Sequence, residues 1–464
     1  MSVMHQEPLC WIEPHQLFAA FAPEPFALFL DSATAGPAND PTLHGRWSFI
    51  ALDPFETLTE ASDPFATLRD RIAQYATHKT APDLPPFTGG AAGFLGYDLG
   101  RHLETLPPAI APFAIDDQQL PQLALGFYDL VIAFDMVMRR AVLFSSGLPE
   151  RDPAAREARA KQRAAALVAR INALNVATCS VKPATPRSVG ANFTRAAYER
   201  AAARIIAYIR AGDIFQANLT QRFETTLHED ETPYDLYLHL RDISPAPFSA
   251  FFNFGEGALI SSSPERFLVC RDGKVETKPI KGTRPRGQVP EEDQRLAADL
   301  LASEKDRAEN VMIVDLLRND LSRSCADHSV IVEKLCALEG FANVHHLVST
   351  INGHLRDDTT PLDLFMRAFP GGSITGAPKL RAMEIIAGLE PTTRGPYCGS
   401  IGYFGFDGAM DTSIAIRTMI VKDRRITFQA GGGIVADSDP AAEYEESLTK
   451  ARAMFAALGG TLAP

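Results

Sequence analysis

Apolar positions along the first 150 residues follow the spacing of short β-strands. Apolar runs bounded by Gly and Pro predict strands at 26–30 and 47–51, and two neighbouring strands at 127–134 and 140–144. The glycine-rich stretch 89–97 has no Walker lysine after it and lacks the glycine spacing of a dinucleotide turn. We therefore expect a tightly packed strand crossing at that point rather than a nucleotide loop.

The pattern changes after residue 150. An Ala- and Arg-rich segment at 153–174 has helical spacing and predicts a solvent-exposed helix. The Pro-containing stretch 182–188 then predicts the main boundary, between an N-terminal subdomain at 1–186 and a catalytic domain at 187–464.

In the second part the pattern alternates between helical and strand-like segments. The predicted helices are 194–210 (capped by Asn192 or Thr194), 291–318, 361–368, 380–387 and 441–457. The predicted strands are 214–223, 250–254, 268–271, 330–338, 401–406 and 425–429. Strands in groups, without regular βαβ alternation, favour an α+β fold.

Composition limits the classes of function. The chain has 464 residues and a formal net charge of -12, which argues against nucleic-acid binding through a general basic footprint. No apolar run is long enough for a membrane helix, and the first 14 residues lack the features of a signal peptide. Six dispersed cysteines are typical of free thiols in a reducing cytosol, so we expect a cytoplasmic protein without structural zinc.

Basic residues gather in one loop of this acidic chain. Four cations lie between Lys278 and Gly287, and they are compatible either with an anionic small molecule or with a solvated basic turn. Lys281 stands apart because it lies between Ile280 and Gly282. A partly buried lysine at this position would lose its proton more easily and become a nucleophile.

Paired carboxylates recur on two predicted helices. Asp306 and Glu309 share one helix face, and Glu443 and Glu446 share another, with Lys450 one turn further on. Two such faces meeting over one divalent ion would suit Mg²⁺, which takes one or two protein carboxylates and completes its shell with water and substrate oxygens. The alternative is ordinary surface charge on two helices.

Three other features leave alternatives open. The glycines at 431–433 form either an anion-binding nest or a plain turn. Arg417 stands in an apolar strand-like segment, so its partner is either an anionic ligand or a structural carboxylate. His346 of the pair His345-His346 is either a proton donor in a site or a satisfied core histidine.

Taken together, these segments resemble the chorismate-utilising enzyme family. The similarity runs nearly continuously from Asn192 to Leu458, and a weaker similarity covers 30–33 and 89–98. The motifs that carry it, in the family's order, are 212–218, 263–267, 279–287, 306–320, 346–349, 376–379, 394–397 and 431–450. The resemblance implies large antiparallel β-sheets packed as a sandwich with helices outside.

The resemblance also implies roles for matching positions. Glu309 and Glu446 would bind Mg²⁺, with Asp306 and Glu443 contributing through water molecules. The metal would in turn bind the ring carboxylate of chorismate. The remaining substrate contacts would come from Thr283 and Ser373 at the ring, His346 near the C4 hydroxyl, Lys450, and Arg417, Tyr397 and the backbone of Gly431 and Gly433 at the enolpyruvyl carboxylate. Ser373 stands where the family often has Thr.

Lys281 discriminates within the family. Anthranilate-forming and water-using members carry Ala there, and the water-using members have a general-base Lys near Gln216. Lys281 with Gln216 therefore resembles the members that convert chorismate and ammonia to 4-amino-4-deoxychorismate on the route to p-aminobenzoate and folate. The implied mechanism has Lys281 attack ring C2 while the C4 hydroxyl leaves, with Glu265 as acid and base, before ammonia adds at C4.

None of the six cysteines has the setting of a glutaminase nucleophile, so the resemblance implies a separate glutamine amidotransferase subunit as the ammonia source. Asp31, Ser32 and Pro245 stand in segments that form a tryptophan pocket in relatives, and tryptophan binding here is a hypothesis. Asp31 departs from the Glu usual in the tryptophan-inhibited relatives. The alternative functions are anthranilate formation and a catalytically silent chorismate- or tryptophan-binding regulator.

Overall fold

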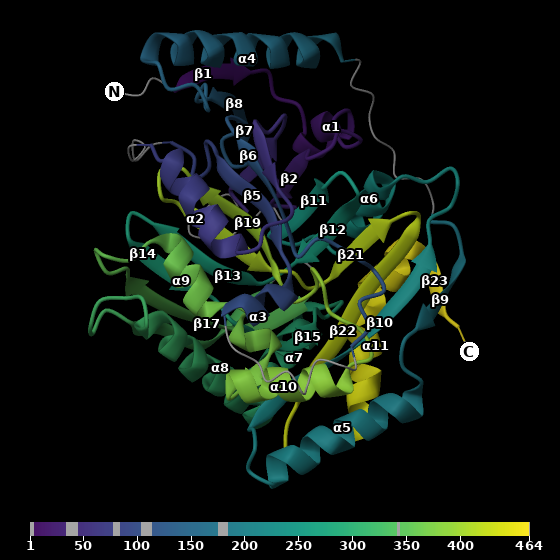
Figure 1. The fold of residues 1–464 in the computed structure, drawn as a ribbon. Coiled ribbons are helices and arrows are strands. Elements are labelled where there is room, and N and C mark those ends of the chain that lie inside the picture. Colours follow the sequence, from purple (N-terminus) through teal and green to yellow (C-terminus); the bar gives the residue numbers. More distant parts are fainter. Residues whose placement is uncertain are drawn as a thin grey trace.

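Two large, mostly antiparallel β-sheets form the centre of the molecule (Figure 1). The computed structural model describes residues 4–33, 45–77, 84–103, 114–174, 184–340 and 344–463. Within these ranges the larger sheet has 13 strands and the smaller sheet has 10.

The 13-stranded sheet mixes strands from distant parts of the chain. Its order is β1 (His5–Leu9), β8 (Arg140–Ser145), β7 (Leu130–Asp135), β3 (Trp47–Ala51), β2 (Leu28–Asp31), β11 (Phe248–Asn253), β12 (Gly257–Ser263), β21 (Thr418–Lys422), β22 (Arg425–Ile434), β10 (Gln216–Thr226), β9 (Arg187–Ala191) and β23 (Gly460–Leu462). The short β18 (Gly376–Ala377) also pairs with β10. Every pairing is antiparallel except that of β23 with β9.

The 10-stranded sheet is antiparallel throughout. Its order is β15 (Ile280–Pro285), β17 (Val344–His354), β14 (Lys274–Thr277), β13 (Arg266–Arg271), β20 (Met410–Ile414), β19 (Ser400–Gly405), β5 (Gly90–Leu95), β6 (Leu123–Tyr128) and β4 (Glu56–Leu58), and β16 (Ile331–Gly340) pairs with β17.

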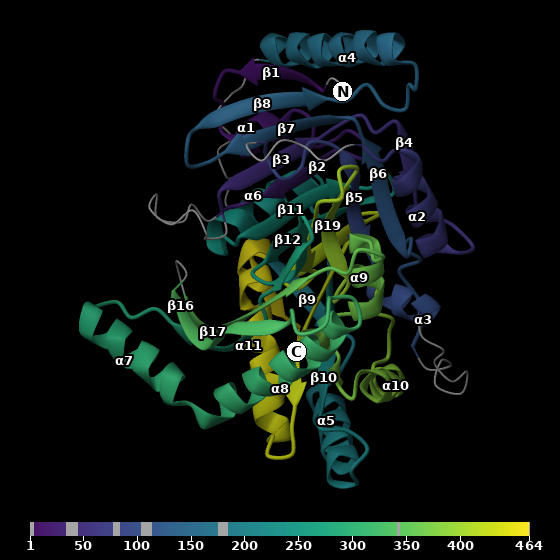
Figure 2. The same ribbon diagram turned by 90° about the vertical axis from the view of Figure 1, so that its left-hand side faces the viewer.

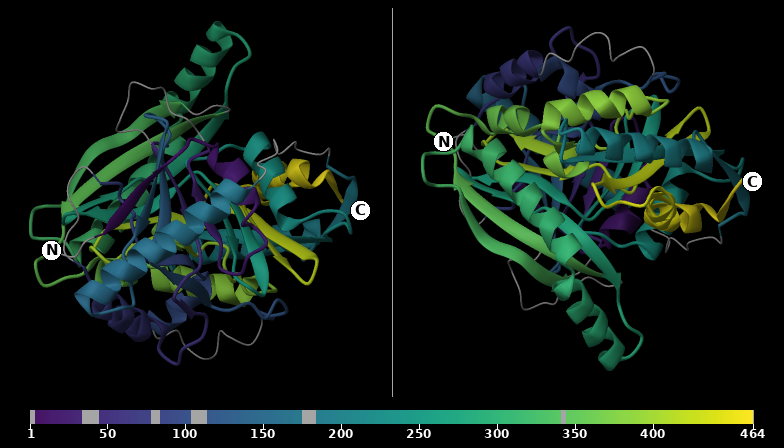
Figure 3. Two further views of the ribbon diagram at one scale, coloured as in Figure 1. Left: turned by 90° about the horizontal axis from the view of Figure 1, so that it is seen from above. Right: turned by 90° about the horizontal axis from the view of Figure 1, so that it is seen from below.

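Helices cover the outside of both sheets. They are α1 (Pro14–Ala19), α2 (Pro64–Gln74), α3 (Gly100–Leu103), α4 (Pro153–Ala173), α5 (Arg195–Arg210), α6 (Pro233–Ile243), α7 (Pro290–Ala302), α8 (Glu304–Ser322), α9 (Pro361–Ala368), α10 (Lys379–Leu389) and α11 (Pro440–Leu458). Helix α4 lies across one end of the molecule over β1 and β8 (Figure 1), and α7 projects from one side beside β16 (Figure 2). Helices α5, α8, α10 and α11 lie together at the opposite end (Figure 3).

The apolar core between the sheets accounts for the sandwich. Phe49 of the larger sheet meets Tyr403 of the smaller one, with ring centroids 6.1 Å apart, and Phe252 meets Phe94 at 6.4 Å. All four rings are buried. Burying rings of this size removes a large apolar area from water, which favours the face-to-face packing. The predicted fold class is confirmed.

Both sheets contain strands from each side of residue 186. In the larger sheet β2 pairs with β11, and in the smaller sheet β5 pairs with β19. The predicted boundary falls between α4 and β9 and stays a prediction. None of the helices in the described ranges combines the length and apolar character needed to cross a membrane.

Most predicted elements lie where the pattern placed them, including the pair β7–β8 and the glycine-rich strand β5. The glycines of β5 permit close backbone approach, because a Cβ on Gly93 would lie 2.1 Å from the Ala124 carbonyl oxygen. One continuous helix at 291–318 is wrong. Ser303 has extended backbone and its side chain accepts a hydrogen bond from the Asp306 N–H, so α7 ends and a newly capped α8 begins.

Candidate active site

Lys281 lies in a buried group of polar side chains drawn from three separate segments. Its Nζ donates to the carbonyl oxygen of Ser373 over 3.1 Å. The side chain of Ser373 in turn hydrogen bonds to the carboxyl of Glu265, which is 5% exposed. Ser373 belongs to the short 3-10 helix η3 (Gly372–Ile374), and Glu265 lies in the turn between β12 and β13. The structure therefore places Lys281, Ser373 and Glu265, three of the site residues predicted from the sequence, close together.

Burial shifts the proton affinities of this group toward neutral forms. Burial, followed by the nearby Lys450 cation, lowers the pKa of Lys281. Burial also raises the pKa of Glu265, against the opposing effects of Ser373 and Lys281. An amine that loses its proton more easily, beside a carboxyl that keeps its proton more readily, suits nucleophilic attack with acid–base assistance.

A β-bulge shapes the strand that carries Lys281. Lys281 pairs with Leu347, but Thr283 pairs with His346, so Gly282 is the extra residue. Gly282 has φ +74°, and a Cβ there would lie 2.9 Å from the Asp306 Cβ. Glycine is therefore needed both for the backbone conformation and for the close approach of α8.

Two of the four predicted metal-binding carboxylates, Glu443 and Glu446, lie against one face of β22. A Cβ on Gly432 would lie 3.1 Å from Glu446 Oε1 and 3.3 Å from Glu443 Oε2. Glu309 lies near enough to Glu446 for the two charges to affect each other. The fourth residue, Asp306, forms an ion pair with Arg284 at 3.3 Å, and its predicted supporting role stays a prediction.

The electrostatics of these carboxylates suit a bound cation. Burial raises the pKa of Glu309 and of Glu443. Burial opposes ionisation of Glu446 as well, but Lys450, 2.7 Å away, holds the pKa of Glu446 below its usual value. Glu443 Oε2 is buried and has no hydrogen-bond partner in the described structure.

These carboxylates suit a divalent ion that takes only some of its ligands from the protein. In the described ranges no three His, Cys, Asp or Glu side chains form a preassembled metal cage. Mg²⁺ requires no such cage, because it binds through one or two carboxylates and fills the other positions with water and substrate oxygens. Glu309 and Glu446, with the unpartnered oxygen of Glu443 beside them, are the residues that fit this description.

His346 lies inward on β17 and is 2% exposed. Its Nδ1 lies 2.9 Å from the hydroxyl of Thr283 and 3.3 Å from the carbonyl oxygen of Gly282. Burial and the neighbouring Arg417 lower the pKa of His346 to about 4. The imidazole is therefore neutral near pH 7, which leaves it able to share a hydrogen bond with a hydroxyl group of a ligand.

Arg417 lies between β20 and β21 with φ +50°, so its predicted place inside a strand is wrong. Loss of water around the guanidinium lowers its pKa. No carboxylate forms an ion pair with it anywhere in the described ranges, so the structural carboxylate left open by the sequence is not found. A poorly hydrated guanidinium without an anion is an anion-binding group.

The glycines at 431–433 form neither a nest nor a turn. They continue β22 and pair with β10, with Gly431 opposite Thr220. Their backbone groups follow the extended ladder instead of converging on one point. Pairing with β21 stops at Phe428, so this stretch has a strand partner on one side only. The predicted role of Gly431 and Gly433 in carboxylate binding stays a prediction, as does that of the buried Tyr397.

Sequence reasoning did not assign a role to Asn218, although it lies inside one of the motifs. Its Nδ2 donates to the carbonyl oxygen of Ser373 over 2.7 Å, and its side chain is buried. The available signal was a polar amide between the apolar residues Ala217 and Leu219 of β10.

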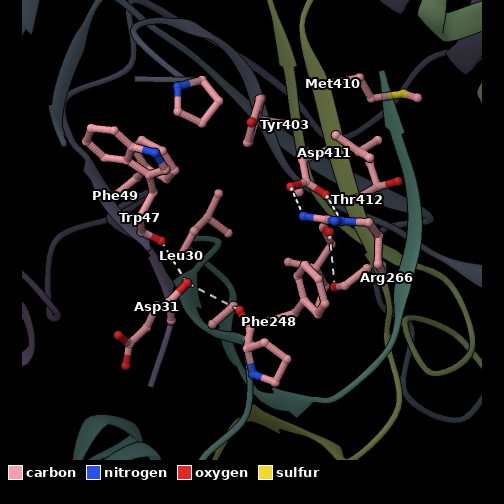
Figure 4. A pocket seen from close by; sticks show the side chains of 18 of the residues that line it. Leu30, Asp31, Trp47, Phe49, Phe248, Arg266, Tyr403, Met410, Asp411 and Thr412 are labelled. Atoms are coloured by element: carbon pink, nitrogen blue, oxygen red, sulfur yellow. Dashed lines mark hydrogen bonds and ion pairs between the residues drawn. The ribbon is translucent and has the colours of Figure 1, made fainter. Parts of the chain in front are cut away.

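A cavity of about 350 Å³ lies apart from these residues, between the two sheets (Figure 4). Asp31 and Ser32 line it, as predicted for the tryptophan pocket, but Pro245 does not and Pro247 does. The Asp31 carboxylate points away from the cavity, accepting hydrogen bonds from Tyr237 at 2.7 Å and Arg241 at 2.6 Å. Aromatic side chains and the Arg266–Asp411 ion pair form the remaining walls.

Comparison with known proteins places this site in a family. Residues 29–456 match the model of the family described as chorismate binding enzyme. The chain belongs to this chorismate-binding enzyme family.

Relatives within the chorismate-binding family carry two different names. The chain is 41% identical to aminodeoxychorismate synthase component 1 of Klebsiella aerogenes over 93% of this chain and 94% of the relative. It is 42% identical to anthranilate synthase component 1 of Streptomyces coelicolor, over 89% and 81%. Among solved structures, anthranilate synthase component I from Streptococcus pneumoniae aligns with a TM-score of 0.77 at 33% identity, covering 91% and 94%.

Proposed function

We propose that this chorismate-binding enzyme acts as an aminodeoxychorismate synthase component 1, converting chorismate and ammonia to 4-amino-4-deoxychorismate for p-aminobenzoate and folate synthesis. Overall identity does not decide between the two named activities, because relatives of both kinds are about equally similar. The observation that carries the proposal is Lys281, a partly buried lysine with a lowered pKa, linked through Ser373 to Glu265.

The first step forms a bond between Lys281 Nζ and ring C2. Both double bonds of the ring shift, from C1=C2 to C1=C6 and from C5=C6 to C4=C5, the C4–O bond breaks, and Glu265 gives its proton to the departing hydroxyl, which leaves as water. The Glu265 carboxylate then takes a proton from the nitrogen that has attacked. A hydroxyl group leaves poorly unless it is protonated, so an acid with a raised pKa is suited to this step.

The second step reverses the first with ammonia as the nucleophile. Ammonia bonds to C4, the ring electrons shift back, and the bond between C2 and Lys281 breaks. Glu265 returns a proton to the lysine nitrogen, and the Glu265 carboxylate then takes one proton from the new C4 ammonium group. The sum is chorismate plus ammonia giving the 4-amino product and water, with Lys281 and Glu265 regenerated.

Substrate recognition in this proposal uses the charges around the lysine. Arg417, with Tyr397 and the one-sided strand at 431–433, would bind the enolpyruvyl carboxylate. Glu309 and Glu446 would hold Mg²⁺, which when bound neutralises charge at the ring carboxylate, and Lys450 adds a further positive charge there. His346, held by Thr283, would contact the C4 hydroxyl region.

Two partners complete the proposal. A separate glutamine amidotransferase subunit would supply the ammonia. Tryptophan would occupy the 350 Å³ cavity lined by Asp31 and Ser32. Calorimetry on protein stripped by unfolding and refolding tests the tryptophan part, and absence of heat on adding tryptophan would remove it.

Product identity tests the main proposal. Purified protein is incubated with chorismate, Mg²⁺ and an ammonium salt, and the product is treated with an aminodeoxychorismate lyase. Formation of p-aminobenzoate is expected. Fluorescent anthranilate with release of pyruvate would assign the protein to the other named activity, and absence of any turnover would favour a silent regulator.

A substitution at Lys281 tests the covalent step. We expect Lys281→Ala to lower kcat by about a thousandfold or more, because the nucleophile is removed. Lys305→Ala is the matched control. The charge of Lys305, like that of Lys281, acts on Glu309 and Glu446, but Lys305 has no part in the proposed bond changes. A Lys281→Ala variant with nearly full turnover would contradict the mechanism.

A further inference from the structure

Arg394 is a fully buried guanidinium that lies behind the site. It is 2% exposed and sits in the segment between α10 and β19. Its Nε and Nη2 donate to the two carboxylate oxygens of Glu390 over 2.9 and 2.7 Å, and its Cζ lies 4.6 Å from the ring centroid of Tyr97. Taking such a pair out of water is costly, and apolar side chains of similar volume often stabilise a core better. The guanidinium of Arg394 also binds groups other than Glu390.

Two further hydrogen bonds of Arg394 go to backbone carbonyl groups of different elements. Nη1 donates to the oxygen of Ile374 in η3 over 2.9 Å, and Nη2 donates to the oxygen of Asn218 in β10 over 2.8 Å. One planar group thus joins two segments that lie far apart in the sequence. A lysine cannot reproduce this, because only the fork of the guanidinium reaches several fixed acceptors at once.

Both of these segments are connected directly to Ser373. Ile374 is its neighbour in the chain, and the Asn218 side chain donates to the Ser373 carbonyl oxygen over 2.7 Å. Ser373 is the residue that meets Lys281 through its carbonyl oxygen and Glu265 through its side chain. A shift of Ser373 would therefore move both of the proposed reacting groups relative to each other.

Glu390, the ion-pair partner of Arg394, is itself bound to β10. Its Oε1 accepts hydrogen bonds from both the backbone N–H and the hydroxyl of Thr220, each over 2.9 Å. The Arg394 carbonyl oxygen accepts a hydrogen bond from Gln429 Nε2 on β22 over 3.0 Å. The guanidinium is thus held against β10 through Glu390 and Asn218, and the Arg394 backbone is held against β22.

We infer that Arg394 is a positioning residue, which sets the distance between Lys281 and Glu265 by holding Ser373 from both sides. This inference rests on the proposed function, because it assigns those two residues to the bond-making step. Misplacing reacting groups by about 1 Å can cost roughly a hundredfold in rate. Groups that act in the chemical step affect kcat more than substrate affinity.

The test compares Arg394→Lys with Arg187→Lys. Arg187 forms a similarly buried ion pair, with Glu231 at 2.8 Å, and it makes no contact with Ser373. For Arg394→Lys we expect kcat to fall by about 10- to 100-fold with KM changed less than about threefold, and a Tm change similar to that of Arg187→Lys. For Arg187→Lys we expect kcat close to that of the unmodified protein.

Two outcomes would overturn the inference: equal kcat in Arg394→Lys and Arg187→Lys, or a loss in Arg394→Lys that appears only in KM. If Arg394→Lys does not fold, Asn218→Ala removes the amide that holds Ser373 and must show the same selective loss of kcat. Lys281→Ala in the same assay separates the two proposals. If Lys281→Ala keeps turnover, the proposed function fails. If Lys281→Ala is inactive while Arg394→Lys keeps the kcat of the unmodified protein, only the positioning role fails.

Discussion

At the scale of single residues, His346 shows how burial fixes a protonation state. Burial and Arg417 lower its pKa to about 4, from an ordinary value near 6.5. Between these two pH values the unfolded chain binds a proton at His346 and the folded chain does not. The contribution of the neutral side chain to stability is therefore complete above pH 6.5 and is lost as the pH falls toward 4.

This difference predicts a measurable effect on folding. A shift of this size corresponds to about 3 kcal/mol in the free energy of unfolding. Between pH 7 and pH 4 we expect the unmodified protein to lose about that much more stability than His346→Gln, which has no titrating group at this position. Urea unfolding of both proteins over this pH range gives the comparison. Parallel stability curves for the two proteins would show that His346 titrates normally.

Individual residues of the site differed in how far the sequence could predict them. Lys281 and Glu309 stand in segments whose residue types and spacing indicate chemistry without any structure, whereas the role of Glu265 came only from the family resemblance. Asn218 and Arg394 also stand in motifs, but their function could not be predicted, because it depends on contacts with residues more than 150 positions away in the chain. Local spacing contains no information about such partners.

At the scale of elements, the glycine stretch of β22 shows why local pattern was insufficient. Three consecutive glycines are typical of turns or anion nests, and the sequence left both open. The deciding fact is that this stretch pairs with the start of β10, about 200 residues earlier. By contrast, the capped helices α9 and α11 were predictable, because Thr360 and Asp439 act on their own helices.

The same strand predicts different effects for two neighbouring glycines. A Cβ on Gly433 would lie 1.9 Å from Gln216 Nε2 and 2.9 Å from Asn218 Oδ1, both on buried side chains. A Cβ on Gly432 would only approach the ends of Glu446, Glu443 and Lys450. We expect Gly433→Ala to lower the free energy of unfolding by about 1–3 kcal/mol through overpacking.

Gly432→Ala serves as the matched control. Its methyl group would point at flexible side chains, so the free energy of unfolding should change by less than about 1 kcal/mol. The methyl group would nevertheless occupy the carboxylate face of the site, and KM for chorismate should rise. Urea unfolding and steady-state kinetics measure the two effects. Equal losses of stability in both variants would contradict this reading of β22.

At the scale of the whole molecule, the α+β sandwich was predictable but its strand order was not. Apolar periodicity shows that strands exist and which faces are buried. It does not show that β2 lies beside β11 or β5 beside β19, since each pair joins strands from opposite sides of residue 186. Only the resemblance to a family supplied the sandwich in advance.

This shared arrangement predicts how the two predicted domains behave apart. A fragment of residues 187–464 would leave one edge of β11 and one of β19 without the strands β2 and β5. It would also expose one side of the core in which Phe252 meets Phe94 and Tyr403 meets Phe49. Unpaired strand edges beside exposed aromatic surface favour aggregation over a stable fold.

We therefore expect the 187–464 fragment to show no cooperative thermal transition by circular dichroism, whereas the full chain unfolds in one. Co-expression with residues 1–186 should restore a cooperative transition, because the missing strands return to both sheets. A sharp transition in the isolated 187–464 fragment would mean that the catalytic half folds on its own. In that case the sheet pairings with the N-terminal half would add to stability without being required for folding.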